Sequence, residues 1–502
     1  MLVSAVMLFS RPAYADSSEE TIYSTVRENV LSMMDSKEEA VYGNEWLALN
    51  LTRDGLDVCP YYLKDLIDTI IENEGVLHTS VGNYTNYAKA VLVLTSMGVD
   101  PTNIAGYNLI KPVSDAMQVQ RQGVNGLIYA LLALDSHQYD IEAPEGLPVQ
   151  VDRDYYINLI LKSQLSDGGW DWADIQADPD MTAMAIQALA PYYDSKSNVK
   201  AAIDAALQTL SNLQQPDGGF QTEDAQYQES SESTAMVILA LTALGIDPTK
   251  DDRFIKNGQT VIDNLLSFAA DGGFKHTADG TYDAMATDQG YRALAAYHRL
   301  LEGKTSFYDM SDMKELQVIE TTLTEKILVT EIDDASAVED DMTLITNCDA
   351  LLQIKGKIES LFDLQFVLTD ENGRVCFPIS ESDTPQAVTI MIPEDKLAEL
   401  GDTVLIIGVH EGEVFSITPD SVDKTTGEVT FKASQFSTYA AVSGIEPEVV
   451  PSEDETKPDT PVTPAKTGDH TNTTMWILLM IVCVLVISVV SRIRTYTKRK
   501  EK

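Results

Sequence analysis

The sequence predicts a mainly α-helical fold, an (α/α)6 toroid in which six helical hairpins form a closed ring. Three observations support this prediction. An Asp-Gly-Gly-aromatic motif recurs at Asp167, Asp217 and Asp271, about 50 residues apart. Each copy lies between an apolar helical run and a second run that is apolar or small almost all round, as a buried helix is. Neither end of the array carries the polar cap that an open solenoid needs.

The repeat unit is clearest in residues 154–193. An apolar outer helix leads to Asp167-Gly168-Gly169-Trp170, where we expect the Gly pair to end the helix and Trp170 to fold back onto it. Asp180 is then the expected N-cap of a buried inner helix over 181–190. Further copies cover residues 23–51, 63–94, 199–241 and 254–297, and one more ends with the helix at 125–134. The copies become weaker toward the N-terminus.

These motifs resemble the prenyltransferase and squalene-cyclase repeat family, whose signature is Gln-x-x-x-Gly-Gly-Trp/Phe followed by a Thr-Ala-rich helix. The resemblance spans about residues 20–303. It implies six inner and six outer helices, with a pocket at one end of the inner barrel. We therefore assign residues 16–303 to the toroid.

The rest of the chain changes character. Residues 304–340 are an acidic connector, and 341–445 alternate in the manner of strands and predict a small antiparallel β-sandwich. Residues 446–463 are rich in proline and acids and predict a disordered, semi-extended stalk.

Both ends carry targeting signals. Residues 1–15 resemble a secretory signal peptide cleaved between Ala15 and Asp16, and the missing basic start predicts that it is truncated. Residues 464–502 combine Pro-Ala-Lys-Thr-Gly, an apolar transmembrane span at 475–490 and a basic tail. This arrangement resembles a Gram-positive sortase signal and implies cleavage between Thr467 and Gly468, with sortase and peptidoglycan as partners; a plain membrane anchor is the alternative. Either anchor places the bulk of the chain outside the cell.

The amino-acid composition excludes some classes of partner and of site chemistry. The net charge of −43 makes nucleic acid an unsuitable partner. Four cysteines are too few for a disulfide scaffold; Cys348 and Cys376 both fall in the β region and are able to pair, with free thiols as the default. No cysteine occurs from 60 to 347 and the histidines there are isolated, so we expect no zinc site and no cofactor.

The resemblance to squalene cyclases implies a proton donor. Their Asp-x-Asp-Asp-Thr-Ala motif is matched here by Asp178-Pro179-Asp180-Met181-Thr182-Ala183, which lacks the third acid. Asp180 and Asp178 are therefore the catalytic candidates of a terpenoid-cyclase alternative, although an N-cap role for Asp180 is favoured.

What the sequence favours is a binding barrel. The loops before the inner helices meet at one end and carry an aromatic and acidic rim suited to a cation, a sugar or another polar ligand. Its members are Trp172, Asp178, Asp180, Glu223, Tyr227, Glu232, His276, Tyr282, Asp283 and Asp288. The function predicted from the sequence is thus a non-catalytic surface protein that binds an unidentified small molecule, sugar or protein. The alternatives are a cobalamin-binding protein similar in layout to intrinsic factor, and a terpenoid cyclase.

Overall fold

The computed structural model describes residues 16–77, 83–144, 146, 150–173, 175–221, 228–373, 376–379 and 381–445. The predicted signal peptide, stalk and anchor, with Ala15, Thr467, Gly468 and the span 475–490, lie outside these residues. The chain divides into two units, Met1–Glu446 and Pro447–Lys502. Among the described residues, none of the helices has the length and apolar character needed to cross a membrane.

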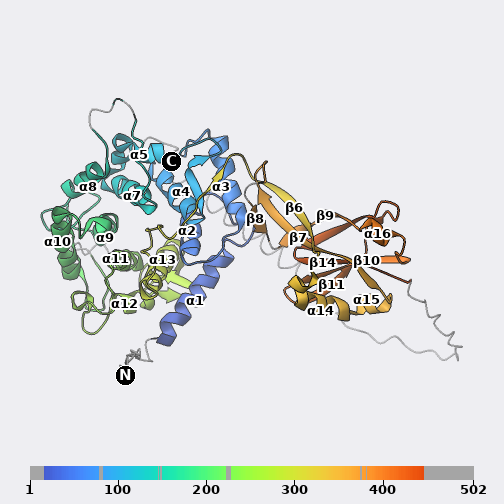
Figure 1. The fold of residues 1–502 in the computed structure, drawn as a ribbon. Coiled ribbons are helices and arrows are strands. Elements are labelled where there is room, and N and C mark those ends of the chain that lie inside the picture. Colours follow the sequence, from blue (N-terminus) through green and yellow to red (C-terminus); the bar gives the residue numbers. More distant parts are fainter. Residues whose placement is uncertain are drawn as a thin grey trace, which may run out of the picture. The chain divides into compact units, whose positions relative to one another are not determined.

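The helical part is a closed ring (Figure 1), as the sequence predicted. Within the described residues, six inner helices pack in chain order, and the last returns to the first. They are α2 (Glu45–Arg53), α4 (Thr85–Ser96), α7 (Gly123–Ser136), α9 (Pro179–Leu189), α11 (Ser231–Ala243) and α13 (Ala284–Leu301). Their side chains are buried on most faces because each inner helix contacts two inner neighbours and the outer layer.

The outer layer consists of the first helix of each hairpin. It comprises α1 (Asp16–Ser32), α3 (Pro60–Glu72), the short pair α5 (Ile110–Ser114) and α6 (Ala116–Val119), α8 (Arg153–Lys162), α10 (Ser197–Leu213) and α12 (Val261–Ser267). Several short strands also pair with one another. β1 (Val99–Ile104) pairs with β5 (Gln317–Ile319), and β2 (Ala269–Ala270), β3 (Gly273–Lys275) and β4 (Tyr282–Asp283) form a small sheet.

The repeated Gly-Gly motif is a turn that follows the outer helix and does not itself end it. α8 already ends at Lys162, and Gln164 then closes the turn by donating its side-chain amide to the Gly168 and Ala202 carbonyls, at 2.8 and 2.9 Å. Gln214 makes the equivalent pair of bonds, to the Gly218 and Phe254 carbonyls, at 2.9 and 3.0 Å. In these two copies, the motif glutamine thus joins the turn to the segment that follows in the ring.

Trp170 folds back as expected. Its indole Nε1–H donates to the Ile160 carbonyl at 2.8 Å, and its ring is fully buried. The two glycines before it differ in role. Gly168 has a φ of +95°, which favours glycine, whereas Gly169 is needed for close approach.

We expect Gly169→Ala to destabilise the ring by about 1–3 kcal/mol, because overpacking a tight contact forces its neighbours to shift. The new Cβ would lie 2.4 Å from Ala177 Cβ and 2.7 Å from Thr182 Oγ1. Thermal unfolding followed by far-ultraviolet circular dichroism measures the effect. Gly280→Ala is the control: Gly280 is exposed, and the nearest atom to its Cβ is at 3.1 Å. Equal melting temperatures for both variants would contradict the close-approach role.

The seam where α13 meets α2 is held by a buried polar cluster. The Asn50 side-chain amide donates to Asp288 Oδ1 at 2.7 Å, and Arg292 donates to Asp288 Oδ2 at 2.7 Å and to Asn50 Oδ1 at 3.0 Å. The Arg292 guanidinium also lies 4.2 Å from the centre of the Trp46 ring. These contacts join the first and last inner helices and close the ring.

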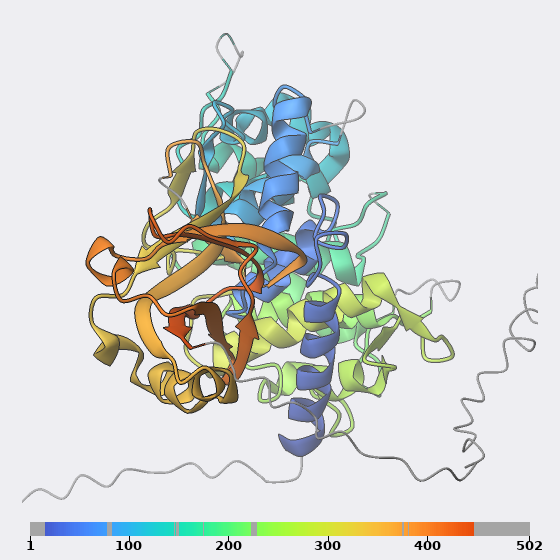
Figure 2. The ribbon, with the colours of Figure 1, turned by 90° about the vertical axis from the view of Figure 1, so that its right-hand side faces the viewer.

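The remaining strands form two antiparallel sheets, coloured from yellow through orange to red in Figure 2. One has the order β11-β10-β14-β7-β6, with β8 on β7; the other has the order β12-β13-β9. The strands are β6 (Thr324–Glu331), β7 (Lys357–Thr369), β8 (Cys376–Ile379), β9 (Glu381–Met391), β10 (Thr403–His410), β11 (Glu413–Ile417), β12 (Ser421–Val422), β13 (Glu428–Gln435) and β14 (Thr438–Gly444). Helices α14 (Glu339–Asn347), α15 (Asp349–Gln353) and α16 (Glu394–Leu397) lie between strands in sequence.

One strand differs from the sequence pattern. β6 lies inside the segment expected to be a connector, and it pairs along β7 from Thr324 to Glu331. Its exposed, charged residues hide the strand in a single sequence, because only pairing to β7 reveals it. Cys59 and Cys348 are free thiols.

Candidate active site

The start of α9 places two acids side by side. Asp178 is the N-cap: its Oδ1 accepts the Met181 N–H at 2.9 Å, and its own N–H donates to the Trp170 carbonyl at 2.9 Å. The expected cap at Asp180 is therefore wrong by two residues, since Pro179 fills the first helical position, where proline is favoured. Asp180 lies in the first turn and is not used for capping.

Asp180 is half-buried, and one oxygen of its carboxyl group is buried without a partner among the described residues. Its Oδ1 is shielded from solvent and has no hydrogen-bond partner in the described part of the chain, while the Ser233 side chain at the start of α11 lowers the pKa of the group. Burial raises the pKa of Asp180 to about 7, and the neighbouring Asp178 charge adds to the rise. A carboxyl group of this kind keeps its proton near neutral pH and can donate it.

A second pair lies near these acids and is formed by Glu232 of α11 and His276, which directly follows the strand β3. His276 Nδ1 is 2.9 Å from Glu232 Oε1 and 3.0 Å from Oε2. The Glu232 side chain is 7 % exposed and that of His276 is 59 % exposed. The charges of both residues act on Asp180, so the two pairs belong to one cluster at the rim.

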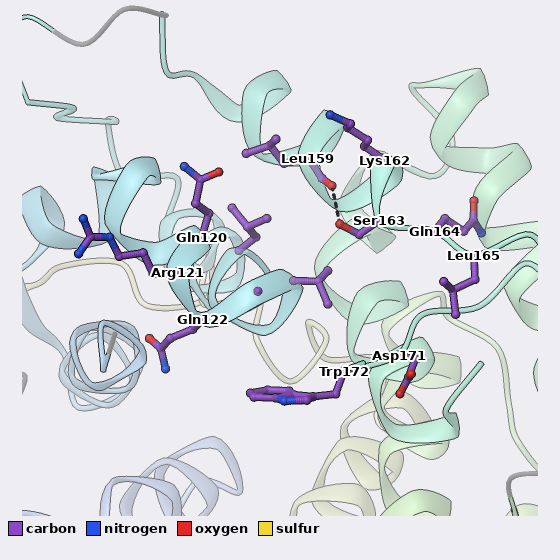
Figure 3. A pocket seen from close by; sticks show the side chains of 13 residues that line it. Gln120, Arg121, Gln122, Leu159, Lys162, Ser163, Gln164, Leu165, Asp171 and Trp172 are labelled. Atoms are coloured by element: carbon purple, nitrogen blue, oxygen red, sulfur yellow. Dashed lines mark hydrogen bonds between the residues drawn. The ribbon is translucent and has the colours of Figure 1, made fainter. Parts of the chain in front are cut away.

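A hollow of about 680 Å³ lies beside the loop that leads to Asp178 (Figure 3). Trp172, with a side chain that is 67 % exposed, forms one wall, and Arg121, Lys162 and Asp171 place charges around it. Amide groups of Gln120, Gln122 and Gln164 complete the polar lining. The charge of Asp171 also raises the pKa of Asp178, although burial of Asp178 is the larger cause, so the hollow and the acid pair are electrostatically linked.

The predicted rim is only partly brought together. Trp172, Asp178, Asp180, Glu232 and His276 belong to the hollow or to the acid cluster. Asp283 caps α13 by accepting the Ala286 N–H at 2.9 Å, and Asp288 belongs to the buried seam. The Tyr282 hydroxyl faces Met33 Sδ at 3.9 Å. Glu223 and Tyr227 lie outside the described residues.

Sequence reasoning missed Ser233, Arg121 and Lys162. Ser233 lies in the first turn of α11, at the same end of an inner helix as Asp180, and this repeat position was the available signal. Neither Arg121 nor Lys162 belongs to the repeat motif, and only the packing of α8 beside α7 brings them to one hollow.

One group in the described part of the chain has the spacing of metal ligands. Glu19, Glu20 and His298 place a ligand atom each within 4.8 Å of one another. His298 Nε2 already pairs with Glu19 Oε1 at 2.8 Å, and its ring stacks on Tyr23. The group joins α1 to α13 and is separate from the acid cluster.

Comparison with known proteins gives only structural neighbours. No family model matches the chain, and no curated protein matches it. Among solved structures, an unsaturated glucuronyl hydrolase from Bacillus sp. GL1, described as responsible for the degradation of glycosaminoglycan, has a TM-score of 0.36 at 12 % identity. It covers 58 % of this chain and 98 % of its own.

Two further neighbours are described as possible members of the GH105 family. The structure from Salmonella enterica has a TM-score of 0.34 at 11 % identity and covers 60 % of this chain and 100 % of its own. The structure from Klebsiella pneumoniae has a TM-score of 0.30 at 13 % identity and covers 60 % of this chain and 98 % of its own. At these TM-scores the likeness does not assign a reaction to this chain.

These findings correct the family and the function predicted from the sequence. The assignment to the prenyltransferase and squalene-cyclase repeat family, displayed as a sortase-anchored surface protein, is wrong: no family model matches, and the structural neighbours are described as an unsaturated glucuronyl hydrolase and as possible members of the GH105 family. The non-catalytic binding function is wrong on the same finding, together with its cobalamin-binding and terpenoid-cyclase alternatives. The repeat motif misled because its glutamine and glycines shape a turn, which any toroid of this kind can use, and carry no chemistry.

Proposed function

We propose that this chain is a carbohydrate-degrading hydrolase in which Asp180 is the general acid. The observation that carries the proposal is the buried Asp180 carboxyl group, which has an unpaired oxygen and a pKa raised to about 7. Glycoside hydrolysis requires a carboxylic acid of this kind to protonate the leaving-group oxygen.

The charge cluster explains how the acid is kept protonated. Asp178 is committed to capping α9 and accepts the Met181 N–H, so it stays beside Asp180 at a fixed position. Its negative charge opposes ionisation of Asp180, and burial opposes it further. In hydrolysis, Asp180 transfers its proton to the departing oxygen as the bond between that oxygen and the sugar carbon breaks. Water then supplies the new oxygen.

The hollow beside the acids suits a sugar. An exposed indole offers an apolar face for a sugar ring, and the Gln120 amide, the Gln164 side-chain oxygen and Asp171 offer hydrogen bonds to hydroxyl groups. Arg121 and Lys162 add positive charge, which favours a substrate carrying a carboxylate or sulfate group. The neighbour described as an unsaturated glucuronyl hydrolase makes glycosaminoglycan fragments the first substrates to try.

The test is hydrolysis of a defined panel by the full chain. The panel contains glycosaminoglycan disaccharides with an unsaturated uronyl end, the same disaccharides without the double bond, and neutral 4-nitrophenyl glycosides. We expect release of sugar from at least one acidic member, detected by mass spectrometry. A chain that releases no sugar from any member, while melting cooperatively, would refute the proposed function.

A further inference from the structure

The His276–Glu232 pair has the geometry of an oriented base. Nδ1 of His276 faces both oxygens of the Glu232 carboxylate, which can only accept hydrogen bonds, so Nδ1 carries the proton. In the neutral ring Nε2 is then a hydrogen-bond acceptor. A buried carboxylate that orients a histidine in this way fixes both the ring and its tautomer.

The backbone around the pair is held firmly. The Ser231 N–H donates to the His276 carbonyl at 3.1 Å, and the Ser231 hydroxyl donates to the Lys275 carbonyl at 2.7 Å. The same hydroxyl lies 3.2 Å from Glu232 Oε2. The start of α11 therefore positions His276, while the exposed ring remains open to water and substrate.

His276 and Asp180 both interact with residues at the start of α11. Glu232 and Ser233 are consecutive residues of α11; the first holds His276, and the second lowers the pKa of Asp180. Asp178, Asp180 and Glu232 are the acids of this cluster, and His276 lowers the pKa of Asp180 when the imidazole is protonated. One turn of helix thus carries the partners of a proton donor and of a proton acceptor.

We propose that His276, oriented by Glu232, is the general base that activates the attacking water; this inference rests on the proposed function of the site. The water oxygen bonds to the sugar carbon, and its proton passes to His276 Nε2. The bond from that carbon to the departing oxygen breaks, and this oxygen takes the proton of Asp180. A proton returning from the imidazolium to the Asp180 carboxylate, through water, restores the starting state.

The experiment compares His276→Ala with wild type on whichever panel substrate is hydrolysed. We expect kcat to fall by about 10²–10³-fold with KM changed by less than about threefold, as for loss of a general base. Added imidazole should restore about tenfold or more of the lost rate, because it replaces the missing base in the space left by the side chain. Glu232→Gln should lower kcat without rescue by imidazole, since an amide can donate to Nδ1 and favour the wrong tautomer.

His298 provides a matched control, because it also pairs with a glutamate, Glu19, but on the outer side of α13. His298→Ala should keep kcat within about threefold of wild type. Full activity of His276→Ala, or a loss that imidazole does not relieve, would overturn the role of His276 and leave the proposed function standing. Absence of turnover by wild type would overturn both.

Discussion

Replacing Asp180 by asparagine is expected to lower kcat about 10²–10⁴-fold on any substrate that the wild-type chain hydrolyses, because an amide cannot donate the proton. KM should change little, since asparagine keeps the shape of the side chain. In wild type, activity should also fall as the pH rises through about 7, where Asp180 loses its proton. Initial rates between about pH 5 and 9 measure both effects.

Asp283→Asn is the matched control for this substitution. Asp283 begins an inner helix at the same point of the repeat as Asp178, and asparagine caps a helix as well as aspartate does. We expect its kcat and melting temperature to equal those of wild type. Retention of activity by Asp180→Asn within a few-fold, with no loss of wild-type rate at alkaline pH, would show that Asp180 is not the acid.

Asp180→Asn should be more stable than wild type at alkaline pH. This gain distinguishes loss of catalysis from loss of folding. The pKa of Asp180 is higher in the folded chain than in the unfolded chain, where it is about 3.9. Between these values the folded state binds more protons, so the free energy of unfolding falls as the pH rises. Asp180→Asn removes this cost, and we expect it to be more stable than wild type by on the order of 2 kcal/mol at about pH 8.5, with little difference at about pH 4. A variant less stable than wild type at alkaline pH would contradict the raised pKa.

Asp288→Ala is expected to cost about 3–5 kcal/mol of unfolding free energy, because it leaves the buried Arg292 guanidinium without its counter-charge. It also removes one of the two acceptors of the Asn50 amide, and only the backbone carbonyl of residue 288, at 2.9 Å, remains, so the seam between α2 and α13 is weakened. Urea unfolding followed by circular dichroism and by tryptophan fluorescence measures the loss, and Trp46, which stacks on Arg292, reports the seam directly.

The control is a salt bridge with the same spacing on the surface. Lys200 and Asp204 are also four residues apart on one helix, with side chains 49 % and 50 % exposed. Asp204→Ala should cost about 1 kcal/mol or less, since solvent screens exposed pairs. Similar losses for Asp288→Ala and Asp204→Ala would show that the seam cluster does not close the ring.

The ring could be predicted because its signal is local and periodic. The Gln164 and Gln214 turns recur with the same bonds, and the inner helices other than α2 and α13 are apolar on nearly all faces. The boundaries were less predictable: the glycines of the motif lie several residues beyond the end of α8, because the turn needs both a left-handed residue and a close contact. The strand β6, with exposed and charged residues, is defined only by its pairing with β7.

The sequence named some residues of the candidate site, but it missed Ser233, Arg121 and Lys162 and did not predict how the residues are grouped. The sequence singled out Asp178, Asp180, Glu232 and His276, yet it assigned the cap to Asp180 and treated His276 as isolated. Asp283 and Asp288 have the same residue type and a similar place in the sequence, but one is a cap and the other a partner of a buried arginine. Residue type and spacing cannot distinguish these roles.

By itself, the sequence determined the helical ring, its repeat and the end of the barrel where polar side chains gather, because periodicity and turn residues act within a few positions of the chain. The tertiary structure alone decided which acid is buried, which histidine faces which glutamate and how the first inner helix meets the last. These depend on contacts between residues such as Asn50 and Asp288, which lie far apart in the chain. The protonation of Asp180 depends in the same way on burial and on the neighbouring charge of Asp178, and both are properties of the packed ring.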